Sequence, residues 1–215
     1  MEAVLANLDQ YWAGFKVTFE LLAVGGIGAL LLGIVVALLR ISPIASLRAL
    51  ATGYTELVRN TPLTMVFFLI IVVLPTLDVR LSFIYGAYLS LAIYTSAFVA
   101  EAIRSGINGV PIGQVEAARS VGLTFGQTVR VIILPQAFRM TIPPLINVFI
   151  ALTKNTSVAA GFYIVELVAV SKQLANENGN AVIPILIGIA VCYLIITIPL
   201  GQIAGIIERK VSVQR

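Results

Sequence analysis

Five long apolar segments constrain this chain more than any other feature of its sequence. Each is long enough, at about 1.5 Å per residue in a helix, to cross about 30 Å of hydrocarbon. They lie at about residues 17–39, 55–76, 82–103, 137–160 and 182–206. Because lipid offers no hydrogen bonds, a segment that crosses it must satisfy its backbone groups internally. The sequence therefore predicts an all-α integral membrane protein, a single domain over residues 1–215 with five transmembrane helices.

The composition excludes several other classes of protein. Charged residues make up 11% of the chain and hydrophobic residues 59%, whereas soluble domains carry about 25% charged residues. The chain has no histidine and one cysteine, Cys192, which lies in an apolar segment. A disulfide framework and most zinc sites are thereby excluded, and no metal or cofactor is expected in this chain. The net charge of +4 comes without a Lys/Arg cluster, so no nucleic-acid partner is expected.

The charges outside the spans predict the orientation of the chain, because cytoplasmic connections of membrane proteins carry the excess of Lys and Arg. One set of connections and termini holds ten basic residues, namely Arg40, Arg48, Arg59, Arg104, Arg119, Arg130, Arg139, Arg209, Lys210 and Arg215. The other set holds three, namely Lys16, Arg80 and Lys172. The N-terminus is therefore expected outside, as part of a retained helix, and the C-terminus in the cytoplasm.

A polar segment from Glu116 to Pro135 separates the third span from the fourth, on the predicted cytoplasmic side. Its apolar residues recur at spacings of three and four, which predicts one apolar face on a helix. The residues of this face are Val115, Ala118, Gly122, Phe125 and Val129. The periodicity alone fits two structures, an amphipathic loop on lipid headgroups or a helix that docks on a soluble partner.

Glycine and proline interrupt this segment. Gly122 would cost a continuous helix about 1 kcal/mol relative to alanine. It therefore indicates a turn between two short helices, or a place where another group approaches the backbone closely. Pro135 and the pair Pro143-Pro144 are expected to restart the chain into the fourth span.

The literal sequence of this segment resembles the signature loop of ABC importer permeases. That signature is Glu-Ala-Ala, three residues, Gly, nine residues and Ile-x-Leu-Pro. All its fixed positions are present, at Glu116, Ala117, Ala118, Gly122, Ile132, Leu134 and Pro135. Four more segments are similar to permeases of the polar amino-acid uptake family, which imports glutamate, glutamine, aspartate, arginine and histidine. They are Glu56–Pro62, Gly113–Gln114, Leu134–Ala137 and Lys154–Ser157.

The resemblance implies a type I importer core of five helices in a bacterial cell membrane. It also implies a second permease subunit, identical or homologous, two cytoplasmic ATPase subunits that bind ATP and Mg, and an external solute-binding protein. In this family a coupling loop, here at about residues 104–136, contacts the ATPase through a helix at about 113–126. The residues implied in this contact are Gly113, Gln114, Glu116, Ala117, Ala118, Arg119, Gly122 and Phe125.

The chain itself has no Gly-x-x-x-x-Gly-Lys-Ser/Thr phosphate loop. It is therefore expected to be a transport subunit rather than an enzyme, with its energy supplied through contact with the ATPase. An ion-coupled secondary carrier or channel subunit is the alternative, which midplane carboxylates or broken helices in repeated halves would favour.

Polar residues in and near the spans are candidates for the pathway of a polar amino acid, because buried charges usually face the interior of a helix bundle. They are Asn60, Thr61, Glu101, Lys154, Asn155, Thr156 and Ser157. Lys154 would meet the carboxylate of an amino acid, which favours an anionic substrate such as glutamate. Alternatively, it would pair with Glu101 or Glu166, or extend its ammonium group to the outer membrane interface.

Structural roles compete with a pathway role for several other residues. The spacing of Glu101 and Arg104 predicts a local ion pair. Thr61 is expected to be the N-cap of the second span, with Pro62 at its first helical position. Residues 171–180 are expected to form the main polar external loop, either solvated or facing the binding protein.

Overall fold

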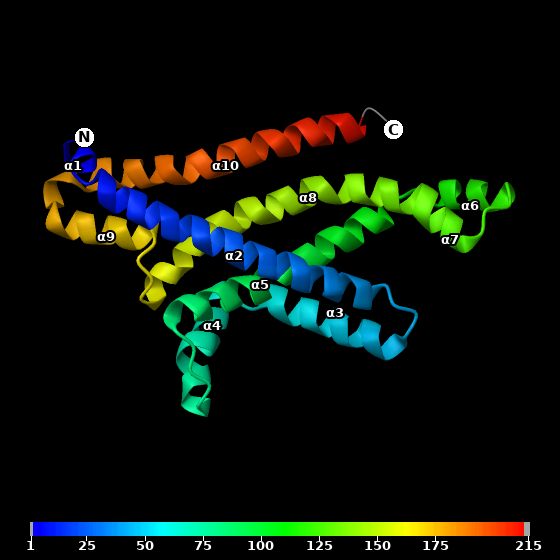
Figure 1. Ribbon diagram of the computed structural model, residues 1–215, viewed down its shortest axis with the longest axis horizontal. Coiled ribbons are helices and arrows are strands. Elements are labelled where there is room, and N and C mark those ends of the chain that lie inside the picture. The colour runs from blue at the N-terminus through cyan, green and yellow to red at the C-terminus, as the bar shows by residue number, and fades with distance from the viewer. Residues whose placement is uncertain (1, 213–215) are drawn as a thin grey trace.

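The computed structural model describes residues 2–212, and the side-chain environments of residues 4–210. Arg215, counted above among the basic residues, lies outside this range. The described residues form helices and no strand (Figure 1). Within them, four helices are long and apolar enough to cross a membrane, Leu8–Arg40, Phe83–Asn108, Phe125–Phe162 and Gly179–Lys210. A fifth span results if one bent helix pair is counted with them.

The elements follow one another along the chain with short connections. The first half contains α1 (Glu2–Leu5), α2 (Leu8–Arg40), α3 (Ala45–Asn60), α4 (Leu63–Phe68), η1 (Leu69–Val73), η2 (Leu74–Leu77) and α5 (Phe83–Asn108). The second half contains α6 (Ile112–Ser120), α7 (Phe125–Gln127), η3 (Thr128–Ile133), α8 (Leu134–Asn155), η4 (Thr156–Phe162), α9 (Leu167–Glu177), η5 (Gly179–Ala181) and α10 (Val182–Ser212).

The predicted second span, residues 55–76, is not one straight helix. Ala45–Asn60 and Leu63–Leu77 meet at an angle of 104°. The ring of Pro62 disfavours the helical region for the residue before it, and Thr61 accordingly lies at φ −94° and ψ 133°. Thr61 ends α3 instead of beginning the next helix, and its hydroxyl donates to the Leu57 carbonyl at 2.7 Å. Pro62 precedes α4 rather than occupying its first helical position.

The prolines of the fourth span do not interrupt it, contrary to the prediction. The helix runs continuously from Phe125 to Phe162, with Pro143 and Pro144 inside α8. Pro135 follows a six-residue π-helical stretch, η3, and lies in the first turn of α8. Each proline lacks the N–H that would bond the carbonyl one turn earlier, a defect that packed membrane helices tolerate.

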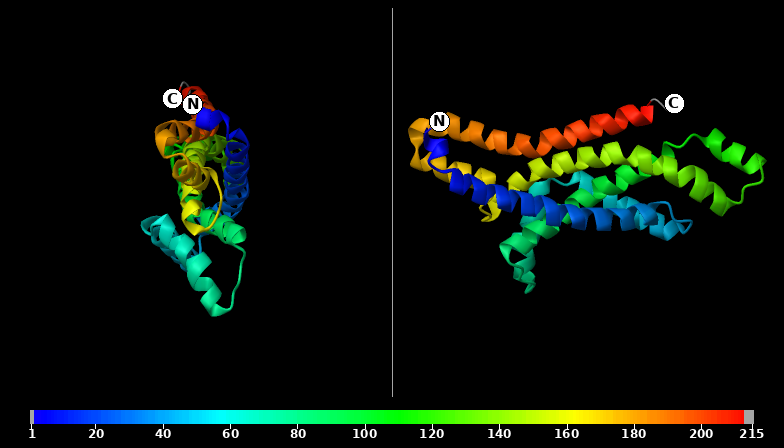
Figure 2. Two further views of the ribbon diagram at one scale, coloured as in Figure 1. Left: turned by 90° about the vertical axis from the view of Figure 1, so that its left-hand side faces the viewer. Right: turned by 45° about the horizontal axis from the view of Figure 1, so that its top comes forward.

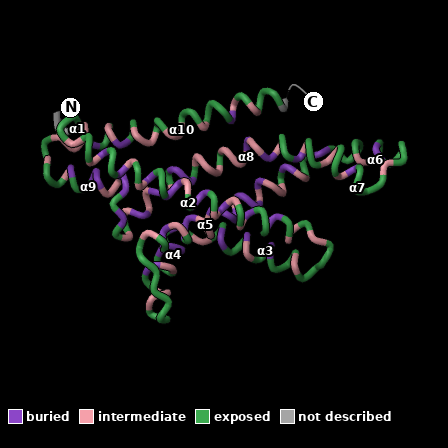
Figure 3. Tube along the Cα trace, viewed as in Figure 1, coloured by how far each residue is buried: buried purple, intermediate pink, exposed green. Residues whose placement is uncertain are grey.

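The core lies where α2 crosses α5, because small residues bring the two backbones together. A Cβ on Gly33 would lie 2.5 Å from Val99 Cγ1 and 2.9 Å from the Ser96 carbonyl oxygen. Leu21 of α2 and Leu91 of α5 are fully buried beside this contact line. Figure 3 shows this burial concentrated in α2 and α5, whereas α10 is largely exposed along its length.

The two ends of the molecule differ. The N-terminus and α9 lie at one end, and the α2–α3 link, the α6–α7 region and the C-terminal end of α10 lie at the other (Figure 1). Residues 171–180 are not the predicted polar loop, since α9 extends to Glu177 and Ser171 is buried.

Candidate functional site

Helices α6 and α7 form a hairpin that projects beyond the spans. Figure 1 and the right-hand view of Figure 2 show it at one extremity, past the ends of α2 and α3. Pro111 precedes α6, and its carbonyl accepts a hydrogen bond from the Gln114 N–H at 3.1 Å. A proline before the first turn suits a helix start, because its fixed φ and missing N–H conflict with no helical bond.

Gly122 makes the turn between α6 and α7. Its φ of +84° lies in the left-handed region, which side chains disfavour. The Gly122 N–H donates to the Arg119 carbonyl at 3.0 Å and the Leu123 N–H to the Ala118 carbonyl at 3.1 Å, a Schellman termination. No other group lies within 4 Å of a Cβ placed on Gly122. Of the two expectations for this glycine, the turn is confirmed, and among the described residues of this chain no other backbone approaches it.

A capping box begins α7. The Gln127 Oε1 atom accepts the Thr124 N–H at 2.9 Å, and the Gln127 N–H donates to Thr124 Oγ1 at 3.4 Å. This reciprocal pair satisfies two N–H groups at the helix start. The Gln136 side chain donates to the Gln114 side chain, which ties α8 to the first turn of α6.

The predicted continuous apolar face is wrong, because the Gly122 turn changes the helical phase. Ala118 faces the protein and is buried, whereas Phe125 is 73% exposed on the far side of the turn. Ile112 and Val121 are exposed on the same hairpin, to 75% and 76%. Large apolar side chains left in the open at the extremity of a molecule indicate a surface that a partner protein or the membrane surface covers.

The structure brings the residues expected to contact an ATPase onto this hairpin. Ala118 is buried, and the other seven are exposed, namely Gly113, Gln114, Glu116, Ala117, Arg119, Gly122 and Phe125. An exposed backbone and short side chains over much of α6 permit close approach by another protein.

Glu101 joins three helices. The predicted pair with Arg104 is present within α5. In addition, Arg40 Nη1 of α2 lies 2.5 Å from Glu101 Oε2, and Arg59 Nη1 of α3 lies 3.7 Å from the same oxygen. The Arg59 guanidinium also lies over the Phe98 ring, 5.6 Å from its centroid. Three cations around one carboxylate leave this cluster positive, which the local spacing did not reveal.

The Lys154–Ser157 segment lies at the junction of α8 and η4. Lys154 is exposed, Thr156 is buried, and Asn155 and Ser157 are half-buried. The Thr156 hydroxyl donates to the Thr153 carbonyl and the Ser157 hydroxyl to the Lys154 carbonyl, both at 2.7 Å. These two hydroxyl groups therefore bond to their own helix.

Neither suggested partner of Lys154 pairs with it among the described side chains. Glu101 is held by the arginines, and Glu166 is buried as the N-cap of α9. Glu166 accepts the Val168 N–H at 2.8 Å and the Tyr193 hydroxyl at 3.0 Å. Burial raises the pKa of the Glu166 carboxyl. The expectation that Lys154 pairs with Glu101 or Glu166 is therefore wrong.

Asn60 and Thr61 lie at the bend between α3 and α4, away from this segment in the chain. The Asn60 amide donates to the Glu56 carbonyl at 2.8 Å, and Thr61 bonds its own helix in the same way. Both side chains therefore terminate α3, and the structure records no contact that joins them to Lys154 within residues 4–210.

Asn147 is a polar residue that the sequence reasoning missed. It is exposed, and its side chain forms no hydrogen bond among the described residues. It precedes Lys154 by seven residues, two helical turns, so the two side chains share one face of α8. In the most apolar part of the Phe125–Phe162 helix, 17% of the residues are buried, whereas 56% are buried in the most apolar part of α5. Helical periodicity read from Lys154 would have found this uncovered polar face.

Comparisons with known proteins cover nearly the whole chain. The sequence pattern of the family described as "Binding-protein-dependent transport system inner membrane component" matches residues 29–213. The chain is 40% identical over 213 residues to the glutamate transport system permease protein GluC of Corynebacterium glutamicum, spanning 94% of this chain and 93% of that protein. It is 38% identical over 206 residues to the probable glutamine ABC transporter permease protein GlnM of Bacillus subtilis, spanning 96% and 95%.

A solved structure agrees with these relatives. A chain in a crystal structure of an amino acid ABC transporter with histidines matches with a TM-score of 0.89 at 29% identity, over 96% of both chains. The type I permease fold expected from the sequence is thereby confirmed, and the ion-coupled alternative is not favoured. Such permeases work with a separate ATPase and a partner permease. The chain thus belongs to the family of binding-protein-dependent transport system inner membrane components, as a multi-pass permease subunit of a bacterial ABC importer.

Proposed function

We propose that this chain is the translocating subunit of an ATP-driven importer of polar amino acids, and that α6 is its contact with the ATPase. The exposed α6–α7 hairpin carries this proposal. It projects past the spans, exposes seven of the eight residues expected to contact the ATPase and leaves Ile112, Val121 and Phe125 open. No membrane-embedded helix needs such a surface, whereas a subunit driven by a soluble partner does.

The energy of transport enters through this hairpin. Two ATPase subunits bind ATP and Mg, and their closure moves the α6 helices of two permease subunits together. The transmembrane helices then exchange between inward-open and outward-open states, a two-state equilibrium biased at a remote site. The coupling loop, at about residues 104–136 of a single domain over 1–215, transmits this bias into α5 and α8, which flank it directly.

The substrate pathway lies along the uncovered polar face of α8. The exposed Asn147 lies inside the span and is costly against lipid, so a second permease subunit, identical or homologous, is the natural neighbour of this face. Lys154 lies toward one end of the face and Asn147 two turns away. The pathway also includes the three residues that follow Lys154, namely Asn155, Thr156 and Ser157. We assign to it as well three residues farther from this face, namely Asn60, Thr61 and Glu101.

The substrate is a polar amino acid. The relatives named for glutamate and glutamine support this class. The cation of Lys154 suits the carboxylate of the substrate and favours an anionic amino acid such as glutamate. An external solute-binding protein delivers it to the side that carries the N-terminus, and the hairpin lies in the cytoplasm, as the distribution of Lys and Arg indicates.

Co-purification with the ATPase tests the proposal. Phe125→Asp, which places a charge on the hairpin, is expected to abolish recovery of the ATPase with the detergent-solubilised permease. Leu5→Asp is the matched control, because Leu5 is 64% exposed at the opposite end of the molecule. Undiminished recovery of the ATPase with a well-expressed Phe125→Asp variant would refute the assignment of α6 and α7.

A further inference from the structure

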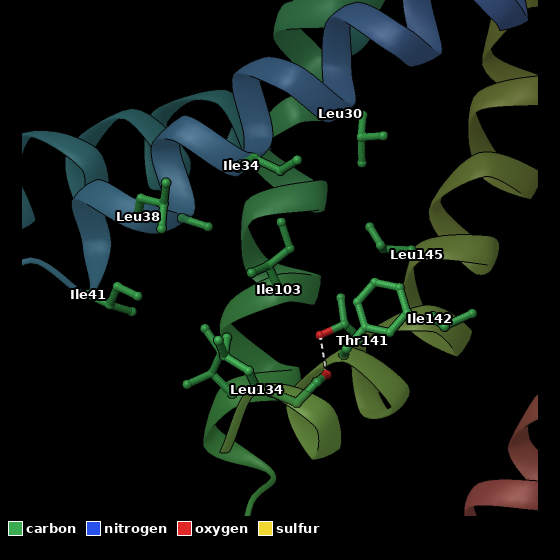
Figure 4. Close-up of a pocket in the computed structure, with 13 residues that line it drawn as sticks. Leu30, Ile34, Leu38, Ile41, Ile103, Leu134, Thr141, Ile142 and Leu145 are labelled. Atoms are coloured by element: carbon green, nitrogen blue, oxygen red, sulfur yellow. Dashed lines mark hydrogen bonds between the residues drawn. The ribbon is translucent and has the colours of Figure 1, made fainter. Parts of the chain in front are cut away.

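An apolar groove of about 400 Å³ runs between α2, α5 and α8. Residues from Leu30 of α2 to Ile41, which directly follows that helix, form one wall (Figure 4). Residues from Leu134 to Leu145 of α8 form the other, and Ile103 of α5 lies between them. Thr141 is the only polar residue that lines it among the described residues. Its hydroxyl donates to the Ala137 carbonyl at 2.7 Å, so the groove offers an occupant an almost purely hydrocarbon surface.

The length of the groove matches one leaflet of a membrane. Leu30 and Ile41 are eleven residues apart, as are Leu134 and Leu145. Eleven residues of helix measure about 16 Å. Half of a hydrocarbon core of about 30 Å is about 15 Å. The groove therefore extends along its two walls about as far as one acyl chain reaches from the membrane surface toward the midplane.

The groove lies on the opposite side of α8 from its polar face. Asn147 follows Phe138 by nine residues, and Lys154 follows Leu145 by nine. Nine residues are 2.5 helical turns, which places each polar residue about 180° from a groove residue. If the polar face meets the second permease subunit, as the proposed function requires, the groove turns away from that subunit and toward lipid.

Basic side chains stand at the end of the groove nearest the α6–α7 hairpin. Arg48 Nη1 donates to the carbonyls of Ser42 and Pro43, both at 2.8 Å, and these two residues directly follow the groove residue Ile41. Its Nε and Nη2 groups remain to meet a ligand. Arg130 is exposed one helical turn before Leu134, the first groove residue of α8. Each wall thus ends beside an exposed arginine.

The balance of charge at this end is positive. The carboxylate closest in sequence to the groove lining is Glu101, which Arg40, Arg59 and Arg104 already share. An apolar channel one leaflet long, with guanidinium groups at its mouth, complements a lipid that carries a negative headgroup.

We propose that the groove binds an acyl chain of an anionic phospholipid, with its headgroup phosphate at Arg48 and Arg130. The arginines distinguish this site from the general lipid contact of any membrane helix. This lipid site is separate from the proposed import function. It rests on that function only for the position of the second permease subunit, which leaves the groove facing lipid.

Native mass spectrometry of the purified permease–ATPase complex tests the site, with phosphatidylglycerol and phosphatidylcholine of the same acyl chains as probes. Ile34→Trp fills the groove, and Ile187→Trp is its matched control on the exposed surface of α10. We expect Ile34→Trp to lower retained phosphatidylglycerol about fivefold and Ile187→Trp to leave it unchanged. Arg48→Gln with Arg130→Gln is expected to lower the preference for phosphatidylglycerol about tenfold.

Two results would overturn the site. In the first, both tryptophan variants retain phosphatidylglycerol as the unmodified complex does. In the second, Ile34→Trp separates the two permease subunits without changing bound lipid, which would make the groove a subunit interface. If the unmodified permease does not co-purify with the ATPase, the proposed function is contradicted but the lipid site is not. The same lipid measurement on the purified permease alone then decides whether the site exists.

Discussion

Gly122 is the residue that determines the shape of the α6–α7 hairpin. Its left-handed backbone ends α6 and lets α7 begin in a new direction. That a turn occurs here was predictable, because glycine is costly in a helix and inexpensive at positive φ. That Phe125 turns outward was not predictable from periodicity, which assumes one unbroken helix.

Two substitutions of Gly122 test whether uptake requires the left-handed turn or only the absence of a side chain at this position. Gly122→Val is expected to abolish ATP-dependent uptake in proteoliposomes while the protein still inserts, because a β-branched residue resists the left-handed region. Gly122→Asn, which tolerates that region, is the matched control and is expected to retain most of the uptake. Equal uptake by the two variants would show that the turn is not required.

Among the elements, the existence of the spans could be predicted and their continuity could not. The five apolar runs located all the spans, because the hydrophobicity of a segment depends only on the residues that it contains. Pro62 breaks its helix, whereas Pro135, Pro143 and Pro144 do not. The difference lies in the backbone before the proline, which is extended at Thr61 and helical at Leu134. A proline disfavours the helical region for the residue before it without forbidding it, so the local sequence alone does not decide between the two.

The contact between α2 and α5 depends on the absence of a side chain at Gly33. Gly33→Ala is expected to destabilise the permease by about 1–3 kcal/mol, because the new methyl group would overlap Val99. Gly53→Ala is the control within α3, where no group lies within 4 Å and alanine favours the helix by up to about 1 kcal/mol. Thermal unfolding in detergent measures both changes, and a Gly33→Ala variant as stable as Gly53→Ala would contradict this packing.

At the scale of the whole molecule, the helices of the chain differ widely in how far they are covered. Its α2 and α5 are well packed, whereas the helix that contains α8 and the helix that contains α10 bury 17% and 11% of their most apolar parts. The sequence identified Lys154 as a pathway candidate, but its surroundings depend on helices far apart in the chain and on a second subunit. The same limit applies to Glu101, whose partners on α2 and α3 appear only in the fold.

Lys154 is expected to act on the substrate rather than on the fold. Lys154→Met should raise the KM for uptake of an anionic amino acid about tenfold, because one charged interaction with the carboxylate is lost. Lys154→Arg should retain most of the affinity, and the melting temperature should stay within about 2 °C for both variants, since Lys154 is exposed. An unchanged KM for Lys154→Met would exclude the contact.

Site-specific cross-linking of α6 to the ATPase tests the central claim most directly. In a Cys192→Ser background, which removes the one native cysteine, Ala117→Cys places a thiol on the exposed surface of α6. Ala6→Cys places one on an exposed position at the opposite end of the molecule. A short bifunctional reagent in native membranes is expected to join the Ala117→Cys permease to the ATPase and to leave the Ala6→Cys permease unlinked. Linkage of neither variant, or of both equally, would contradict the account of α6 as the coupling helix.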